Sequence, residues 1–389
     1  MAFAVAPAGL PRAATRGATT PVARPCTRSA VTARRSAFTP AIGLGATMPA
    51  PAGAPVAAGV SEAHSRSPPH MGASQPYTSI ITGASSSIGM YAAKALIDRG
   101  DTHVVMAVRD PAKAARVASR FGFPDGAYSI LPVDLSSLDS VRTFVNSFRA
   151  GGFRGLTSLV CNAAVWYPRD KAPRLTSDGF DETLQVNHLG HFLMVNLLMG
   201  ELKRSCGRVV FLATPTHNPD TIAGKVPPQA NLGDLAGLEA AIAGTPSGTV
   251  DGGKFEPTKA YKDSKVCNVL TMTALHERAA KDGVVVSAVF PGCIADSELF
   301  REKRGWFRWF FPLFQKYVTK QYVSEEEAGR RVAEVASGAG FGDGGGYWMW
   351  KGSYLEGTDK TTPTRVPSTE REGPKADRLW ELSAKAVGL

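Results

Sequence analysis

The segment that decides the fold of this chain is Thr82-Gly83-Ala84-Ser85-Ser86-Ser87-Ile88-Gly89. It follows the β-rich run TSIIT (78–82) and leads into the helix-forming run AAKALIDRG (92–100). Two glycines permit a tight turn and close helix packing, and the amides at the helix start suit a pyrophosphate. With a strand before it and a helix after it, the turn is typical of dinucleotide binding. The expected phosphate contacts are Gly83, Ser85, Ser86, Ser87, Ile88 and Gly89.

Beyond this turn, short β-rich runs alternate with helix-length segments. The runs are TSIIT (78–82), HVVMAV (103–108), YSILPV (128–133), LTSLVC (156–161), RVVFLA (208–213), VVVSAVF (284–290) and GYWMW (346–350). Ser324 and Glu327 form a capping box that predicts a helix start before the last run. The alternation predicts an α/β, Rossmann-like doubly wound parallel sheet of about seven strands, with helices on both faces, in one domain over residues 76–389.

The first 75 residues have the composition of a leader. They contain seven Arg and one acidic residue, so they carry +6 of the net charge of +10. Arginines spread through Ala, Ser, Thr and Pro without a long apolar region are typical of a transit peptide. The Pro-rich stretch 47–56 would break an amphipathic helix, which favours the plastid over the mitochondrion. We therefore expect residues 1–75 to be a plastid transit peptide or disordered leader.

Composition excludes several other classes of protein. Of the 389 residues 43% are hydrophobic, and no apolar run approaches the ~18 residues that span a bilayer, so neither a disordered chain nor a membrane bundle fits. The charge of +4 outside the leader is too small to indicate nucleic acid binding. The five cysteines make no CxxC pair, which predicts thiols and no metal site, and His188 and His191 suit core or capping roles.

The residue after the second predicted strand favours NADP over NAD. Arg109 stands twenty residues after Gly89, where an NAD enzyme would place an acid for the ribose hydroxyls. A cation there suits the 2′-phosphate of NADP, and Lys113, one helical turn on, could add a second charge. The adjacent Asp110 keeps NAD open as the alternative.

Two polar residues close the next strands. Asp134 ends the third strand and Asn162 the fourth, both at the edge where an open sheet binds its ligand. We expect both to contact the cofactor, although either residue could instead cap a helix.

The stretch Tyr261-Lys262-Asp263-Ser264-Lys265 predicts an acid–base pair on a helix. Residues at i and i+4 share a helix face, so the Lys265 ammonium is expected beside the Tyr261 phenol and should lower its pKa toward neutrality. A tyrosine tuned in this way can act as a general acid. The alternative, a solvated lysine beside a packed tyrosine, is weakened by the nucleotide-binding turn upstream.

Four motifs occur in the order and at roughly the spacing of the short-chain dehydrogenase/reductase family, which the chain resembles. They are TGASSSIG, the CNAA run (161–164), the VNHLGHF run (186–192) and YKDSK. The resemblance implies that Asn187 supports a proton relay and that Thr214 replaces a strand-end serine, with Thr216 as the fallback. Ser87 departs from the family, which has glycine there, so its side chain would either crowd the pyrophosphate or donate to it.

Longer stretches resemble a narrower family, the light-dependent protochlorophyllide oxidoreductases. One is HNPDTIAGKVPPQANLGDL (217–235), in an insertion at 215–258, and another is FPGCIADSELFR (290–301), which runs into an aromatic flap at 298–323. YKDSKVCN (261–268) also matches, so the resemblance covers nearly the whole chain from Tyr77. It implies that NADPH and light absorbed by the pigment reduce the C17–C18 double bond of protochlorophyllide in chlorophyll biosynthesis.

The same resemblance assigns roles to individual residues. It implies that Tyr261 is the proton donor or its organiser and that Lys265 hydrogen-bonds the nicotinamide ribose. Cys293 is expected to bind the pigment and deliver a proton, with a buried structural thiol as the alternative. Ser297 is expected to contact the cofactor, and Phe290 replaces a tyrosine, which removes a phenolic hydrogen bond near the pigment.

The aromatic and basic residues of 306–322 leave several uses open. They suit a flap over a flat pigment, the surface of an anionic membrane, or a patch that completes the core. We therefore expect a stromal or peripherally membrane-associated plastid protein that binds protochlorophyllide and no nucleic acid, with homo-oligomerisation open. Two alternatives remain: a dark short-chain reductase of an apolar carbonyl substrate, and a non-catalytic protein that binds pigment or organises membranes.

Overall fold

The computed structural model describes residues 77–218, 221–294, 322–351, 362–366 and 373–389. The leader, Ser297 and most of the aromatic flap lie outside the described residues, so the expectations for them stay predictions.

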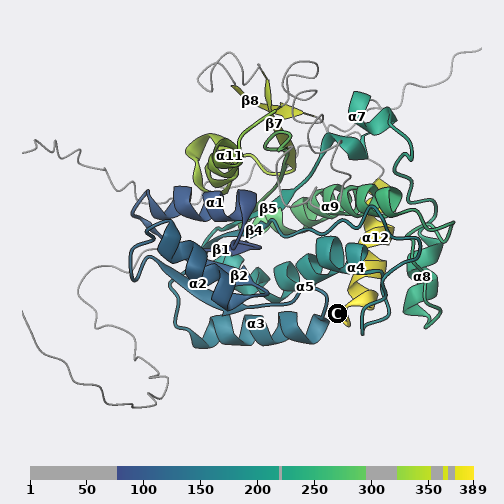
Figure 1. Cartoon of the computed structure of the whole chain (residues 1–389), viewed down its shortest axis with the longest axis horizontal. Helices are drawn as coiled ribbons and strands as arrows, with labels where there is room; N and C mark the ends of the chain where they lie inside the picture. The colour runs from purple at the N-terminus through teal and green to yellow at the C-terminus, as the bar shows by residue number, and fades with distance from the viewer. Residues whose placement is uncertain (1–76, 219–220, 295–321, 352–361, 367–372) are drawn as a thin grey trace, which may run out of the picture. The chain divides into compact units, whose positions relative to one another are not determined.

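In the part of the chain that the structure describes, seven parallel strands form the sheet that the sequence predicts (Figure 1). They are β1 (Tyr77–Thr82), β2 (Thr102–Val108), β3 (Tyr128–Pro132), β4 (Leu156–Cys161), β5 (Arg208–Leu212), β6 (Val285–Val289) and β7 (Gly346–Lys351). An eighth strand, β8 (Thr362–Val366), was not predicted and pairs antiparallel to β7. Its sequence TPTRV contains a proline, which weakens a strand signal but is tolerated at a sheet edge.

The strand order places a ligand site between β1 and β4. The order is β3-β2-β1-β4-β5-β6-β7-β8, so the chain leaves β1 in one direction and continues from β4 in the other. Ligands of doubly wound sheets bind at such a switch point, beyond the carboxyl ends of the strands. Gly83 follows β1 there, and Asn162 follows β4.

Helices cover both faces of the sheet (Figure 1). Adjacent side chains of a strand point to opposite faces, so each strand contributes to two separate hydrophobic cores. Ile81 packs in one core with α1 (Ser87–Ile97), α2 (Pro111–Arg120) and α11 (Glu325–Ser337). Ile80 packs in a second core with α3 (Leu138–Ala150), α5 (Gly190–Leu197), α9 (Pro257–Ala279) and α12 (Gly373–Ala386). The shorter helices are α4 (Glu182–Leu184), η1 (Gln185–Leu189), α6 (Met199–Arg204), η2 (Pro215–His217), α7 (Ile222–Lys225), α8 (Ala236–Ile242), η3 (Ala280–Asp282) and η5 (Ala339–Phe341).

Two local expectations are confirmed, the helix cap at Ser324 and the burial of the two histidines. The Ser324 hydroxyl accepts from the amide of Glu327, 3.1 Å away, and so caps α11. His188 and His191 are buried, and burial lowers the pKa of His188 to about 4, so it stays neutral. Within the described residues, no group of His, Cys, Asp and Glu is placed to hold a metal ion, and no helix is long and apolar enough to cross a membrane.

The cysteine expectation is confirmed only in part. Cys161, Cys267 and Cys293 form no disulfide, whereas Cys206 is disulfide-bonded, so the prediction of thiols throughout is wrong there.

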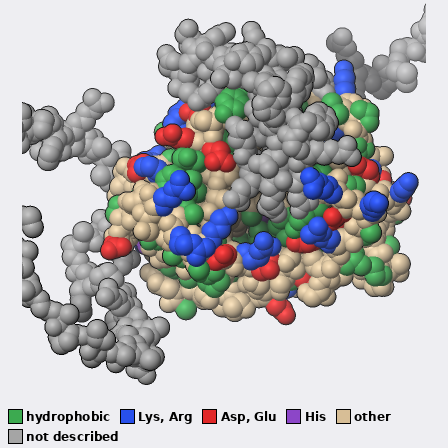
Figure 2. All heavy atoms as spheres, viewed as in Figure 1, with side chains coloured by type: hydrophobic (Ala, Val, Ile, Leu, Met, Phe, Trp, Pro, Cys, Tyr) green, Lys and Arg blue, Asp and Glu red, His purple; other side chains and the backbone are tan. Residues whose placement is uncertain are grey.

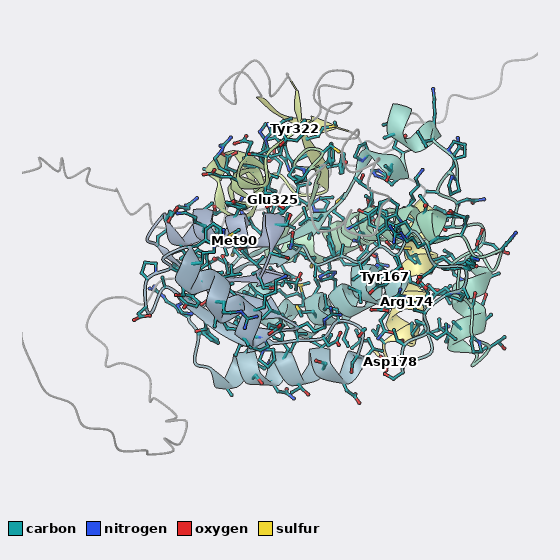
Figure 3. The ribbon with its side chains drawn as sticks, viewed as in Figure 1. Met90, Tyr167, Arg174, Asp178, Tyr322 and Glu325 are labelled. Carbon is teal, nitrogen blue, oxygen red and sulfur yellow. The ribbon has the colours of Figure 1, made fainter. Side chains whose placement is uncertain are left out.

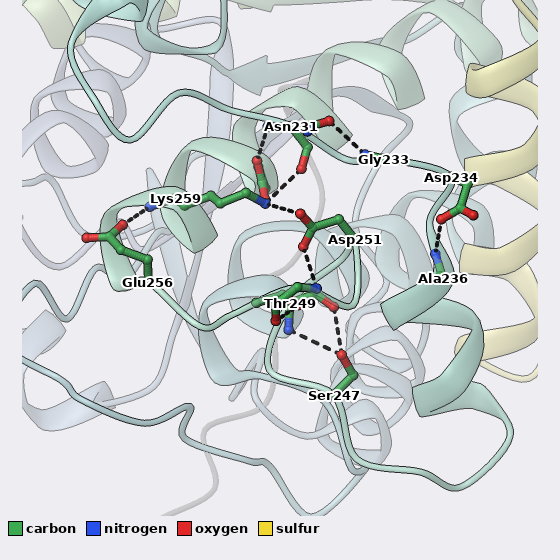
Figure 4. A network of polar contacts seen from close by, with 11 residues as sticks. Asn231, Gly233, Asp234, Ala236, Ser247, Thr249, Asp251, Glu256 and Lys259 are labelled. Atoms are coloured by element: carbon green, nitrogen blue, oxygen red, sulfur yellow. Dashed lines mark hydrogen bonds and ion pairs between the residues drawn. The ribbon is translucent and has the colours of Figure 1, made fainter.

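The insertion is fastened to α9 by polar side chains next to the Tyr261–Lys265 pair. Lys262 Nζ donates to the carbonyls of Val226, at 2.6 Å, and Pro228, at 2.8 Å. Lys259 Nζ lies 2.8 Å from an Asp251 carboxylate oxygen (Figure 4). It also lies 2.6 Å from a carboxylate oxygen of Asp263. The insertion also contributes Leu232, Leu235, Leu238 and Val250 to the core. It is therefore part of the domain, and it positions the helix that carries the acid–base pair.

Candidate active site

A cavity of about 480 Å³ lies at the carboxyl ends of the parallel strands. It is lined by the turn between β1 and α1, by Arg109 and Lys113, and by residues that follow β3 to β6. Every predicted site residue lines it except Asn187, which is buried behind other residues of the protein, and Ser297, which lies outside the described residues. Figure 2 shows Lys and Arg side chains gathered around a hollow on one face of the molecule, with acidic side chains among them.

The two glycines of the turn are required for different reasons. Gly83 has a φ of +67°, in the left-handed region that glycine adopts readily. A Cβ on Gly89 would lie 2.5 Å from the carbonyl oxygen of Gly83 and 2.5 Å from Nδ2 of Asn162. The turn therefore closes only because neither position carries a side chain.

Asn162 and Asp134 line the cavity without capping a helix. Asn162 Nδ2 donates to the carbonyl of Thr82 at 2.8 Å, which ties the end of β4 to the end of β1. Asp134 Oδ1 accepts from the amide of Ser136 at 2.9 Å and shapes the turn after β3, while Ser137 caps α3. The capping alternative is therefore wrong for both residues.

Asp110, the acidic residue that left NAD as the alternative cofactor, has a structural role. The Asp110 carboxylate caps α2 and accepts from the amide of Lys113 at 2.8 Å. The Arg109 and Lys113 side chains both line the cavity. This end of the site therefore presents two cations, while its acid is engaged with the helix.

The Tyr261–Lys265 pair sits on α9 facing the cavity, but its electrostatics differ from the expectation. Lys265 Nζ donates to the carbonyl of Leu212 at 3.1 Å and lies 5.8 Å from the centroid of the Tyr261 ring. Burial lowers the pKa of Lys265 to about 8. Burial, with a smaller contribution from Cys293, raises the pKa of Tyr261. The prediction that Lys265 brings the Tyr261 pKa toward neutrality is wrong, because removal from water outweighs an ammonium held at that distance.

The Asn187 side chain holds two segments together. It lies in the π-helical turn η1, where its Oδ1 accepts from the amide of Val165 at 2.8 Å. Its Nδ2 donates to the carbonyl of Val165 at 3.1 Å and to the Ser264 hydroxyl at 3.0 Å. Ser264 in turn donates to the carbonyl of Tyr261 at 2.7 Å. Asn187 thus fixes the loop after β4 against α9 and does not line the cavity.

Trp166 is a cavity residue that the sequence reasoning missed. Its ring stacks on that of Tyr261, with centroids 5.4 Å apart and planes 30° apart, and both residues line the cavity. The next residue, Tyr167, donates to Glu182 Oε1 at 2.7 Å and lies under the Arg174 guanidinium at 3.8 Å (Figure 3). An aromatic residue just beyond the strand-end Asn162 was the available signal.

Thr214 and Cys293 reach the cavity from the strands on its far side. Thr214 follows β5 and lines the cavity, whereas Thr216, the fallback, does not and donates to the Thr214 hydroxyl at 3.3 Å. Cys293 lies in the turn after β6, together with Phe290.

The turn that carries Cys293 is supported by α11 and by Val323, the residue before the N-cap of that helix. Arg331 Nη1 donates to the carbonyl of Pro291 at 2.9 Å, and its Nε lies 2.8 Å from the buried Glu327 carboxylate. The amide of Val323 donates to the carbonyl of Cys293 at 3.1 Å. Figure 3 shows Tyr322 and Glu325 on the side of the molecule where Met90 of α1 also lies.

A glycine-rich turn at the switch point and a Tyr-Lys pair across the cavity define a short-chain dehydrogenase. The family model for short chain dehydrogenases matches residues 78–219. Solved structures confirm the fold: an uncharacterised protein from Mycobacterium paratuberculosis has a TM-score of 0.55 at 24% identity, covering 81% of this chain and 96% of that one. A gluconate 5-dehydrogenase described as putative, from Beutenbergia cavernae, has a TM-score of 0.52 at 20% identity, covering 70% and 93%.

Curated relatives narrow the class further. The chloroplastic protochlorophyllide reductase of Chlamydomonas reinhardtii is 49% identical over 320 residues, covering 81% of this chain and 79% of the relative. Protochlorophyllide reductase A of Arabidopsis thaliana is 46% identical over 315 residues, covering 80% and 76%. The chain belongs to the protochlorophyllide reductase family.

Proposed function

We propose that this chain is a light-dependent protochlorophyllide reductase of chlorophyll biosynthesis, which reduces the C17–C18 double bond with NADPH. The observation that carries the proposal is a single cavity lined by the dinucleotide turn, by two cations, by Tyr261 and Cys293, and by the aromatic residues Trp166 and Phe290. Relatives named protochlorophyllide reductase are 46–49% identical to this chain. Light dependence is the part of the proposal that rests on the resemblance of the insertion and of the segment that follows β6.

The residues of the cavity fit NADPH. The glycine turn leaves room for a pyrophosphate against the start of α1, and a buried hydroxyl of that turn, Ser87 Oγ, has no hydrogen-bond partner among the described residues. Arg109 and Lys113 would hold the 2′-phosphate, and Lys265 the nicotinamide ribose. NADPH, when bound, supplies the hydride.

Replacing Arg109 by alanine should weaken the binding of NADPH more than that of NADH. The Arg109 cation would pair with the 2′-phosphate, which NADH lacks, so we expect NADPH binding to weaken by about ten- to a hundredfold and NADH binding to change little. Fluorescence titration of both nucleotides in the dark measures this. Arg116→Ala, an exposed change on α2 outside the cavity, is the matched control. Equal weakening for both nucleotides would contradict the assignment of Arg109.

Tyr261 is proposed as the proton donor. Because burial raises its pKa, the phenol keeps its proton at neutral pH. Hydride transfer to one carbon of the double bond leaves negative charge on the other carbon, which is basic enough to take a proton from a weak acid. Asn187 and Trp166 would hold the phenol in place, through the loop after β4 and by stacking. Cys293, on the same cavity, would contact the pigment.

NADPH binding should weaken as pH rises through about 8, the pKa to which burial lowers Lys265. Below that pH the side chain is an ammonium that can hydrogen-bond the ribose; above it, the charge is lost. Cys161, the other group acting on Lys265, has its pKa raised by burial and stays a neutral thiol. The dissociation constant measured from about pH 7 to pH 9.5 tests this, with Lys265→Met expected to bind weakly and without a step. A parental profile as flat as that of Lys265→Met would contradict it.

The protein is a plastid protein, as the chloroplastic relatives and the composition of its leader indicate. Peripheral association with an anionic plastid membrane is part of the proposal. It is supported by the aromatic and basic sequence of 306–322.

An illumination experiment tests the proposed function. Protein starting near residue 72 is mixed with NADPH and protochlorophyllide, and half of each sample is kept dark. Chlorophyllide in the illuminated half alone supports the proposal. Bound pigment without product would favour a pigment-binding protein, and turnover of apolar carbonyl compounds in the dark would favour an ordinary short-chain reductase.

A further inference from the structure

Ser87 combines two unfavourable features at the edge of the cavity. Its backbone has a φ of +46°, in the left-handed region that residues with a side chain rarely adopt. Its Oγ is buried and has no hydrogen-bond partner among the described residues. A strained backbone and an unsatisfied buried hydroxyl both destabilise the free protein, so neither is explained by the folding of the chain alone.

The surroundings of Ser87 indicate the kind of ligand that would compensate. Ser87 lines the cavity and is the first residue of α1, an 11-residue helix whose first amides face its N-terminal end. The preceding Ser86 makes no side-chain cap, and the first turn of α1 contains no acidic residue. A hydroxyl without a partner among the described residues, on the first residue of a helix, suits an anionic oxygen as the acceptor, and the dinucleotide offers such oxygens at its pyrophosphate.

We propose that the Ser87 hydroxyl donates a hydrogen bond to a pyrophosphate oxygen of NADPH, as a specificity-determining contact that glycine at this position could not make. The contact rests on the NADPH site proposed above. The contact gives the buried hydroxyl a hydrogen-bond acceptor only when NADPH is bound. The left-handed backbone at Ser87 therefore serves cofactor binding and does not contribute to the stability of the free protein. The unpartnered oxygen favours this donor role over crowding of the pyrophosphate.

Two substitutions at Ser87 distinguish the effect of the hydroxyl from the effect of the backbone conformation. Ser87→Ala removes the hydroxyl and keeps a side chain, whereas Ser87→Gly removes both the hydroxyl and the backbone strain. We expect both variants to bind NADPH about tenfold more weakly, as measured by fluorescence titration in darkness without pigment. Ser87→Gly should at the same time raise the melting temperature of the free protein, because glycine adopts a positive φ readily. Ser119→Ala, the loss of an exposed hydroxyl on α2, should change neither.

A second probe locates the effect along the nucleotide. Adenosine 2′-monophosphate carries the 2′-phosphate but no pyrophosphate, so its affinity should be the same for the parent and both Ser87 variants. The role of Ser87 would be overturned by variants that bind NADPH as tightly as the parent. It would also be overturned by variants whose affinities for NADPH and for adenosine 2′-monophosphate fall equally. Neither result would contradict the cofactor site itself. A parent protein that binds no NADPH would overturn the cofactor proposal and this contact together.

Discussion

Tyr261→Phe is expected to lower the yield of chlorophyllide per flash by about a hundredfold or more while leaving NADPH binding nearly unchanged. The substitution removes one oxygen atom from a ring that stays packed against Trp166, 5.4 Å away between centroids. The cavity keeps its shape and its cations, so the loss falls on proton delivery. Absorption after single flashes measures the yield, and fluorescence titration in the dark measures binding.

A matched substitution controls for the loss of a phenol elsewhere. Tyr128 lies on β3, outside the cavity, and packs edge-on against Phe123 with centroids 5.7 Å apart. Tyr128→Phe should keep the parental yield. If Tyr261→Phe also keeps it, the proton comes from another group, and Cys293 on the same cavity would be the next residue to replace.

Gly89→Ala should abolish detectable NADPH binding and lower the free energy of unfolding by about 2–3 kcal/mol. The added Cβ would lie 2.5 Å from the backbone carbonyl of Gly83 and 2.5 Å from Nδ2 of Asn162, and the first of these cannot rotate away. The turn must therefore open, which displaces the start of α1 and breaks the tie between β1 and β4. Denaturant unfolding and dark titration of NADPH measure the two effects.

The control for this change is another glycine with open space around it. Gly340 has nothing within 4 Å of the position its Cβ would take, so Gly340→Ala should leave both measurements near the parental values. Parental NADPH affinity in Gly89→Ala would show that the nucleotide does not bind against this turn.

The sequence predicted the parts of the fold that depend on local pattern. The strands, the turn at Gly83 and the cap at Ser324 each follow from a few adjacent residues, and the structure confirms them. The position of Arg109 at the cavity could be predicted because it depends only on the distance of this residue along the chain from the turn. β8 was missed because only its pairing with β7 identifies it as a strand, and because its proline argues against a strand.

The features that escaped prediction depend on distant contacts. The raised pKa of Tyr261 results from burial by segments far apart in the sequence, which the spacing to Lys265 cannot show. The Asn187 amide is engaged by Val165 and Ser264, and Trp166 meets Tyr261 across 95 positions of sequence. Motifs identify residues of chemical interest, but the tertiary structure decides which groups each one touches.

Transfer of an isotopic label tests the central claim most directly. The protein is mixed in darkness with protochlorophyllide and NADPH that carries deuterium at the transferable position, then illuminated, and the product is examined by mass spectrometry. We predict chlorophyllide with one deuterium at the reduced C17–C18 bond, formed only in the light and lost with Tyr261→Phe. Product that forms in darkness, or that carries no deuterium from NADPH, would contradict it.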